Sequence, residues 1–205
     1  MARLSPRDAR AWHDLGGRLA TAMEPLLRPE VVANRAVPAG TGWRLESVET
    51  SFRRLRTMLR AARRAGPDGA VLLLTDVEDF FPSVTPDAVA RSLSAAGAPA
   101  RDAAQAARML DGWASFGYRG LPIGPPASGV VANAVLRPVD DAVGARFLRW
   151  VDDYVALIAT EREAAEVLER IDEALARLGL SRSARKTRIG TAPSWLGSAV
   201  GASTR

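Results

Sequence analysis

The chain contains no cysteine, and it has a single histidine, His13, among its 205 residues. The absence of cysteine excludes disulfide bonds and thiolate metal sites. One histidine argues against a histidine-based metal site and against Ser–His catalysis. Any metal ion would therefore be held by carboxylates, a ligand set that favours magnesium or manganese.

Long apolar runs are also missing from the sequence. None reaches the roughly 20 residues that a membrane-spanning helix needs. The N-terminus carries Arg3, Arg7 and Asp8 and has no apolar core of the kind found in secretion signals. We therefore expect a cytoplasmic protein without membrane contact, whose length suits one sizeable domain or two small ones.

Positive charge exceeds negative charge, because 28 Lys and Arg residues oppose 23 Asp and Glu residues and leave a net charge of +5. A basic surface is the usual electrostatic footprint of a nucleic-acid-binding protein, although many basic proteins bind no nucleic acid. Nearly all of this charge is arginine, and Lys186 is the only lysine. The lone lysine therefore draws attention to its surroundings.

Hydrophobic periodicity predicts helices alternating with short strands. Helices are expected over residues 6–27, 48–64, 100–115, 127–145 and 161–178, and over a segment that follows the capping residues 83–87 and ends near 96. Strands are expected at 70–75, on both sides of Asp152-Asp153, at 186–190 and at 195–200, whereas 28–46 is expected to be irregular. This order indicates an α+β fold whose sheet is backed by helices on one face.

Three aspartates stand out in this pattern. Asp76 ends the buried strand, and Asp152 and Asp153 form the turn of the hairpin. Each has a plain alternative reading, because aspartate is common in turns and caps. Two adjacent carboxylates between apolar strands nevertheless repel each other unless a cation is present. Three carboxylates on neighbouring strand ends could hold two divalent ions, which is the chemistry of nucleotidyl transfer.

Five short motifs, in order, resemble those of the reverse transcriptase palm. Motif A is matched by Asp76 with Phe80-Phe81-Pro82-Ser83, motif B by Gly120 to Ser128, motif C by Trp150-Val151-Asp152-Asp153, motif D by Leu178 to Ser181 and on to Lys186-Thr187, and motif E by Trp195-Leu196-Gly197. The resemblance covers roughly residues 70–200. It implies a fingers–palm architecture with an antiparallel palm sheet, with residues 1–69 as a helical fingers-like region and 70–205 as the palm carrying motifs A to E.

The resemblance also implies roles for individual residues. Asp76, Asp152 and Asp153 would be the catalytic residues and the ligands of Mg²⁺, with Mn²⁺ as an alternative. Lys186 would neutralise charge on the triphosphate or protonate the leaving pyrophosphate. Substrate contacts would come from Asp79, Phe80, Phe81, Gly124 and Ser128. Phe81, five residues after Asp76, would be the bulky ring that excludes a 2′-hydroxyl.

The sequence departs from the family pattern at two points. Ile123 stands where motif B usually has glutamine, and an aliphatic residue at this position is similar to that of abortive-infection and diversity-generating enzymes. Trp150 replaces the usual tyrosine or phenylalanine of motif C. We also expect the thumb to be absent, because the chain leaves no room for it after motif E. The chain would then be a compact enzyme or a fragment, or a protein partner or an oligomer would help to bind the duplex.

The resulting prediction is an RNA-directed DNA polymerase that acts in phage defence or in a retroelement. Its partners would be an RNA template, a DNA or RNA primer and deoxynucleoside triphosphates. Three alternatives stay open at this point. They are a template-independent DNA polymerase with the same site, a non-catalytic nucleic-acid-binding palm, and a structural α+β domain with chance motif matches.

Overall fold

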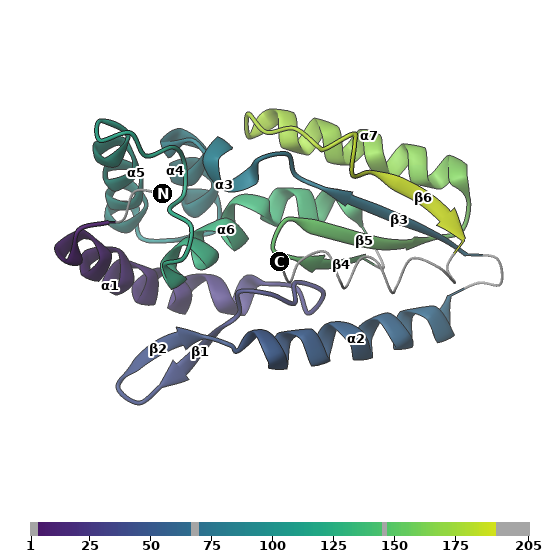
Figure 1. The fold of residues 1–205 in the computed structure, drawn as a ribbon, viewed down its shortest axis with the longest axis horizontal. Coiled ribbons are helices and arrows are strands. Elements are labelled where there is room, and N and C mark those ends of the chain that lie inside the picture. Colours follow the sequence, from purple (N-terminus) through teal and green to yellow (C-terminus); the bar gives the residue numbers. More distant parts are fainter. Residues whose placement is uncertain (1–3, 67–69, 145–146, 192–205) are drawn as a thin grey trace.

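A four-stranded antiparallel sheet in the order β4-β5-β3-β6 forms the centre of the chain in the computed structural model (Figure 1). The structure describes residues 4–66, 70–144 and 147–191. Its strands are β3 (Val71–Asp76), β4 (Phe147–Trp150), β5 (Asp153–Ile158) and β6 (Arg188–Thr191), and a separate hairpin pairs β1 (Ala36–Ala39) with β2 (Gly42–Leu45). The expected strand at 195–200 and motif E lie outside the described residues.

Seven α-helices surround the sheet in the described part of the chain. They are α1 (Pro6–Met23), α2 (Val48–Ala65), α3 (Phe80–Ser83), α4 (Pro86–Ala95), α5 (Ala100–Ala114), α6 (Pro126–Val143) and α7 (Glu161–Arg177), with a 3-10 turn η1 (Glu24–Leu26) after α1. Figure 1 shows α7 above the sheet and α2 below it. These elements confirm the α+β class and its antiparallel sheet, but helices cover both faces of the sheet, whereas the sequence predicts them on one face.

Successive side chains along each strand point to opposite faces of the sheet, as period-two geometry requires. On β5, Tyr154, Ala156 and Ile158 are buried in the main core, whereas Asp153, Val155 and Leu157 are only partly buried. The helices α6 and α7 supply apolar partners on the core face, including Val135, Leu136, Val167, Ile171 and Leu175. The opposite face lies toward α2 and carries a much smaller cluster of Val32, Leu55 and Leu148.

The N-terminal helix α1 shares the main core with the palm-like part. Trp12, Leu15 and Leu19 are fully buried in the same cluster as α6 residues. The indole Nε1 of Trp12 donates a hydrogen bond to the Ser128 hydroxyl at 3.0 Å. The main core therefore runs continuously across the expected boundary near residue 70.

Two elements differ from expectation. The sequence predicts irregular structure over 28–46, but this segment contains the β1–β2 hairpin, in which Gly40 takes a positive φ of 56° in the turn. Pro38 is tolerated because this ribbon has two edges and little ladder to disrupt. The helix α6 also continues across Pro138, although proline usually disturbs the interior of a helix.

The described residues contain no helix with both the length and the apolar character needed to cross a membrane.

Candidate active site

The antiparallel register brings the three aspartates to one end of the sheet. Asp76 at the end of β3 pairs directly with Asp153 at the start of β5, so both side chains leave the same face. Asp152 lies in the two-residue turn between β4 and β5, and its carbonyl accepts a hydrogen bond from Val77 N–H at 3.3 Å. The face that Asp76 and Asp153 share is the one toward α2.

Lys186 completes this group. Asp76 is only 3% exposed, and its Oδ2 pairs with the ammonium of Lys186. That hydrogen bond raises the pKa of Lys186, and the nearby charges of Asp153 and Asp152 act in the same direction. The lone lysine of the sequence is thus electrostatically coupled to all three predicted carboxylates.

The electrostatics of Asp152 indicate a site that favours added positive charge. Burial, followed by the negative charge of Asp153, raises the pKa of Asp152 to about 6. The other oxygen of Asp76, Oδ1, is buried and has no hydrogen-bond partner. The free oxygen of Asp76 and the neighbouring Asp152 carboxylate, which the charge of Asp153 repels, are the kind of oxygen ligands that Mg²⁺ and Mn²⁺ prefer. Among the described residues, no three acidic or histidine side chains are already grouped as ligands of one ion; the Lys186 ammonium holds Asp76 instead.

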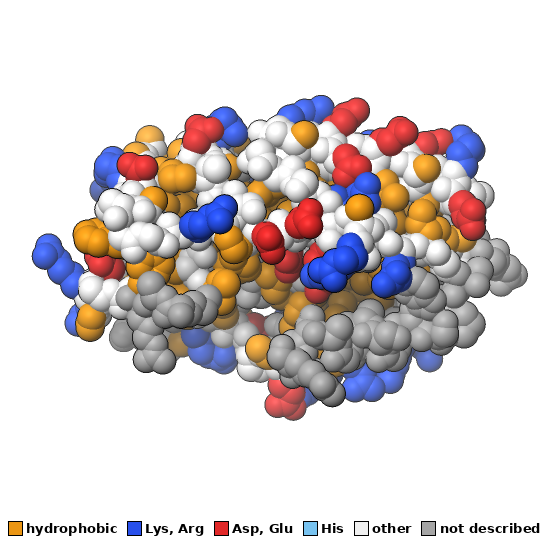
Figure 2. All heavy atoms as spheres, turned by 45° about the horizontal axis from the view of Figure 1, so that its top comes forward, with side chains coloured by type: hydrophobic (Ala, Val, Ile, Leu, Met, Phe, Trp, Pro, Cys, Tyr) orange, Lys and Arg blue, Asp and Glu red, His pale blue; other side chains and the backbone are white. Residues whose placement is uncertain are grey.

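The segment that carries Lys186 is fastened to the end of β3 by backbone hydrogen bonds. Ser183 N–H donates to Asp76 O, and Glu78 N–H donates to Ser181 O, each at 2.9 Å. The view in Figure 2 shows acidic side chains near the middle of the molecule, with lysine or arginine side chains beside them. The position of Lys186 is therefore set by long-range strand pairing, which the sequence pattern alone does not reveal.

The two phenylalanines of motif A have different environments. Phe80 is 2% exposed in the core, whereas Phe81 is partly buried and packs edge-on against it, with ring centroids 5.5 Å apart. The Phe81 carbonyl accepts a hydrogen bond from Leu121 N–H at 2.8 Å. Gly120, with φ of 62°, lies so close that an added Cβ would be 2.0 Å from the Phe81 oxygen. Glycine is thus required there by the motif A backbone, and the contact holds Phe81 in place.

The remaining predicted substrate residues are spread out. Asp79 is exposed and has a left-handed backbone with φ of 42°, at the start of α3. Gly124, with φ of 112°, has open space around its Cα, and Ile123 beside it is 58% exposed. Ser128 is only 1% exposed and is hydrogen-bonded to Trp12. The structure places Ser128 in the core, and its contact with substrate stays a prediction.

A family model for reverse transcriptase (RNA-dependent DNA polymerase) matches residues 31–200. The chain belongs to the reverse transcriptase family.

Enzymes of this family use divalent metal ions, in agreement with the carboxylates found here. Among solved structures, an apo telomerase from Candida tropicalis, truncated from its C-terminal domain, is similar with a TM-score of 0.49 and 14% identity. The similarity covers 73% of this chain and 36% of the telomerase chain, so this chain spans about a third of that structure. No curated protein sequence matches the present chain.

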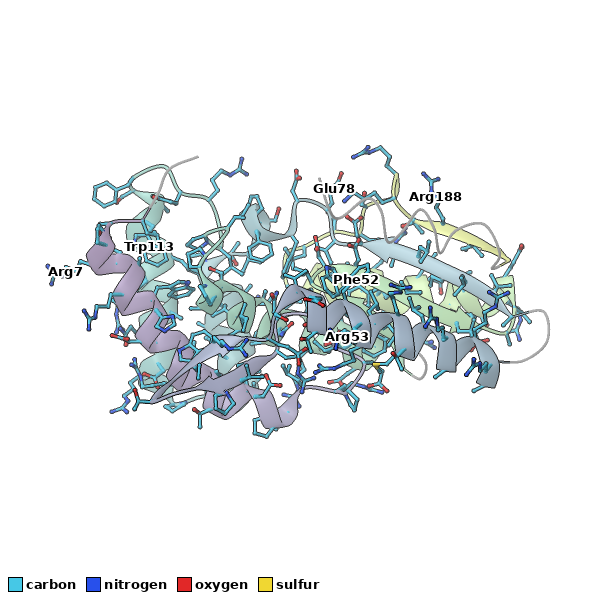
Figure 3. All side chains as sticks on the ribbon, turned by 60° about the horizontal axis from the view of Figure 1, so that its bottom comes forward. Arg7, Phe52, Arg53, Glu78, Trp113 and Arg188 are labelled. Carbon is cyan, nitrogen blue, oxygen red and sulfur yellow. The ribbon has the colours of Figure 1, made fainter. Side chains whose placement is uncertain are left out.

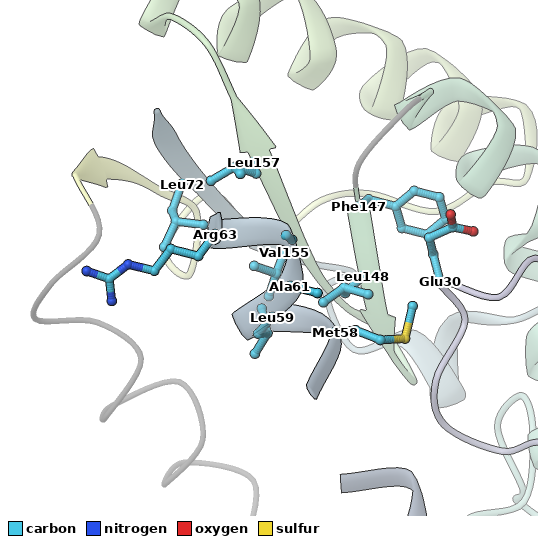
Figure 4. A pocket seen from close by; sticks show the side chains of 11 residues that line it. Glu30, Met58, Leu59, Ala61, Arg63, Leu72, Phe147, Leu148, Val155 and Leu157 are labelled. Atoms are coloured by element: carbon cyan, nitrogen blue, oxygen red, sulfur yellow. The ribbon is translucent and has the colours of Figure 1, made fainter. Parts of the chain in front are cut away.

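This reverse transcriptase domain also has an apolar cavity of about 220 Å³ between α2 and the sheet (Figure 4). Its lining includes Met58 and Leu59 from α2, Leu148 from β4, and Val155 and Leu157 from β5. None of the three aspartates lines it. The cavity therefore marks loose packing beneath α2 and is separate from the carboxylate site.

One buried feature of the motif C hairpin is not evident from local sequence patterns. Arg149 is completely buried and forms an ion pair with Asp140 of α6, whose side chain is 2% exposed. A charged residue at a core-facing strand position, and an aspartate on the apolar face of a helix, are the signals that could have revealed the pair.

Proposed function

We propose that this chain is an RNA-directed DNA polymerase that adds deoxynucleotides to a primer by two-metal nucleotidyl transfer. The observation that carries the proposal is the pairing of Asp76 with Asp153, with Asp152 in the adjoining turn and Lys186 against Asp76. The family match supports the same reaction class.

Asp76, Asp152 and Asp153 would hold Mg²⁺ or Mn²⁺. The bound ions would supply activation of the primer 3′-hydroxyl and stabilisation of the leaving phosphate oxygen. The Lys186 ammonium pairs with Asp76, and its raised pKa keeps it charged near neutral pH. Its proposed role is to neutralise charge on the triphosphate and to provide a proton for the leaving pyrophosphate.

The substrate would be positioned by motif A and motif B. The backbone around Asp79 and Phe80 is proposed to cradle the triphosphate, with the Phe81 ring beneath the sugar. Gly124 has the open surroundings that close approach of a nucleotide would need. An RNA template and a DNA or RNA primer would lie along the carboxylate-bearing face, and a protein partner or second copy could add grip on the duplex. The proposed setting is phage defence or a retroelement.

A second candidate is a template-independent DNA polymerase with the same site. It is favoured by Ile123, whose exposed aliphatic side chain cannot form the hydrogen bonds that glutamine could make to a nucleotide or template. Primer extension with and without a template strand separates the two functions.

The test is homopolymer-templated DNA synthesis with Mg²⁺ or Mn²⁺. We expect Asp76→Ala and Asp152→Asn to lower incorporation by at least about 10³-fold, because the chemistry depends on positioning by ligands that these changes remove. Asp111→Asn, at an exposed position on α5, is the matched control and should keep wild-type activity. Near-wild-type synthesis by either site variant would contradict the metal assignment.

A further inference from the structure

Arg149 is a buried side chain next to the site that makes four hydrogen bonds. Its guanidinium donates to both carboxylate oxygens of Asp140, from Nε to Oδ1 at 2.7 Å and from Nη2 to Oδ2 at 2.8 Å. Nη1 donates to Asn133 Oδ1 at 3.0 Å and to the Val151 carbonyl at 2.7 Å. The planar fork of the guanidinium makes these four hydrogen bonds to three partners, one bond more than the three donors of a lysine ammonium could make.

Stability alone does not explain this pair. Removing two charges from water is unfavourable, so well-packed apolar residues of similar volume often stabilise a core equally well or better. A leucine or methionine at position 149 could fill the space, but it could not donate a hydrogen bond to the Val151 carbonyl. That bond is the part of the network that reaches the active site.

The Val151 carbonyl belongs to the peptide that leads directly into Asp152. Val151 has a positive φ of 57°, which is strained for a β-branched residue. Such a conformation persists only when its surroundings hold it. Arg149 supplies one such restraint by fixing the orientation of this peptide plane.

The network also contacts the residue that follows the pair Asp152-Asp153. Tyr154, the residue after Asp153, donates its hydroxyl to Asp140 Oδ1 at 3.0 Å. Asp140 therefore reaches the backbone before Asp152 through Arg149, and the side chain after Asp153 through Tyr154. Asn133 extends the network by donating to the carbonyls of Ala33 at 3.3 Å and Asn34 at 3.1 Å.

We propose that Arg149 and Asp140 are positioning residues that orient the turn bearing Asp152 and Asp153 for catalysis. The inference rests on the proposed polymerase function, and it assigns these two residues no contact with substrate. Their network joins α6, the motif C turn and the loop at 33–34, so the geometry of the carboxylates depends on a buried pair on the core face of the sheet.

The main test is the double variant Arg149→Met/Asp140→Leu, which removes both charges and keeps side-chain volume. We expect the double variant to stay folded with a lowered melting temperature, because apolar residues can replace a buried ion pair but Asn133 Oδ1, the Val151 carbonyl and the Tyr154 hydroxyl each lose a partner. We expect kcat to fall about 10- to 100-fold with little change in the nucleotide KM, since displaced catalytic groups cost rate on this scale.

The control is Arg18→Met, which removes the ion pair between Arg18 and the buried Asp102 of α5, at 3.0 Å. It should change kcat by less than twofold. Tyr154→Phe removes a single hydroxyl from the network and should lower kcat several-fold, with a nearly unchanged melting temperature. This variant tests the inference even if the double variant does not fold.

Binding of Mn²⁺, followed by electron paramagnetic resonance, separates this inference from the polymerase proposal. We expect the double variant and Tyr154→Phe to bind Mn²⁺ several-fold more weakly than wild type, whether or not wild type synthesises DNA. Inactive wild type with this loss of affinity would overturn the polymerase function and support the positioning role. A folded double variant, or Tyr154→Phe, with wild-type kcat and Mn²⁺ affinity would overturn the positioning role.

Discussion

The two faces of the central sheet are covered in contrasting ways. On the core face, Leu73 and Ile158 are buried against α6 and α7 at 1% and 3% exposure. On the other face, α2 buries only Ser51 and Leu55 and leaves an apolar cavity of about 220 Å³ (Figures 3 and 4). The dense face supplies stability, and the loosely covered face presents the carboxylates of Asp76 and Asp153.

The contrast shows how one sheet can serve two tasks. Tight packing of apolar side chains contributes most of the free energy of folding. Under the proposed function the other face must admit a nucleotide and a duplex, so it cannot be packed in the same way. The contacts of α2 with the sheet include an edge-on pair between Phe52 and Trp150, with ring centroids 5.6 Å apart, and α2 carries exposed arginines along its solvent side.

The largest expected effect breaks the dense face. Leu73→Ala should lower the free energy of unfolding by about 2–5 kcal/mol, because it leaves a cavity in a packed core. Leu59→Ala, on the loose face, should cost about 1 kcal/mol or less, because Leu59 already borders a cavity. Urea denaturation of both variants measures the difference. Equal losses would mean that α2 is packed as firmly as α6 and α7.

The contrast can be sharpened within motif A. Phe81→Val should admit ribonucleotides at least about tenfold better relative to deoxynucleotides, because a smaller side chain makes room for the 2′-hydroxyl. Phe80→Val is the matched control, since Phe80 is buried, and it should lower stability without changing the nucleotide ratio. Competition between the two nucleotide types in primer extension measures the ratio. An unchanged ratio in Phe81→Val would assign Phe81 to packing alone.

A smaller effect is expected from the arginines of α2. Neutralising Arg56, Arg60 and Arg63, all exposed, should weaken primer–template binding and reduce the log–log salt slope by about 0.7–0.9 for each arginine–phosphate interaction that is removed. The same number of exposed arginines elsewhere, Arg7, Arg10 and Arg108, serve as the control. Fluorescence anisotropy at several salt concentrations gives both slopes. Identical slopes for the two variants and wild type would remove α2 from the nucleic-acid path.

The smallest effect concerns pH in the absence of metal. The pKa of Asp152 is raised to about 6 in the folded protein from an ordinary 3.8, so the folded state binds this proton more tightly than the unfolded state. The resulting stability is present at low pH and is lost as pH rises through about 6. The melting temperature of wild type should therefore fall by a few degrees between about pH 5 and pH 7.5, and that of Asp152→Asn should not show this fall. Parallel curves for the two proteins would contradict the shift.

Local patterns in the sequence were sufficient for much of the fold. The apolar run at 70–75 is the buried strand β3, the segments around Asp152 form the predicted hairpin, and the amphipathic pattern at 161–178 is α7. The family match confirms the resemblance carried by the motifs. These features were predictable because periodicity and turn chemistry act over a few neighbouring residues.

Tertiary structure alone decided the contacts between distant segments. Gly120 is needed because its loop touches Phe81, Ser128 is buried because Trp12 covers it, and Arg149 is bound by Asp140 of α6. No local pattern encodes such pairs, since the energy of a buried polar group depends on which partner the fold brings within hydrogen-bond distance. The sequence by itself therefore determined which carboxylates are present and on which strand ends they stand. The packing of α6 against the sheet decided what surrounds and orients them.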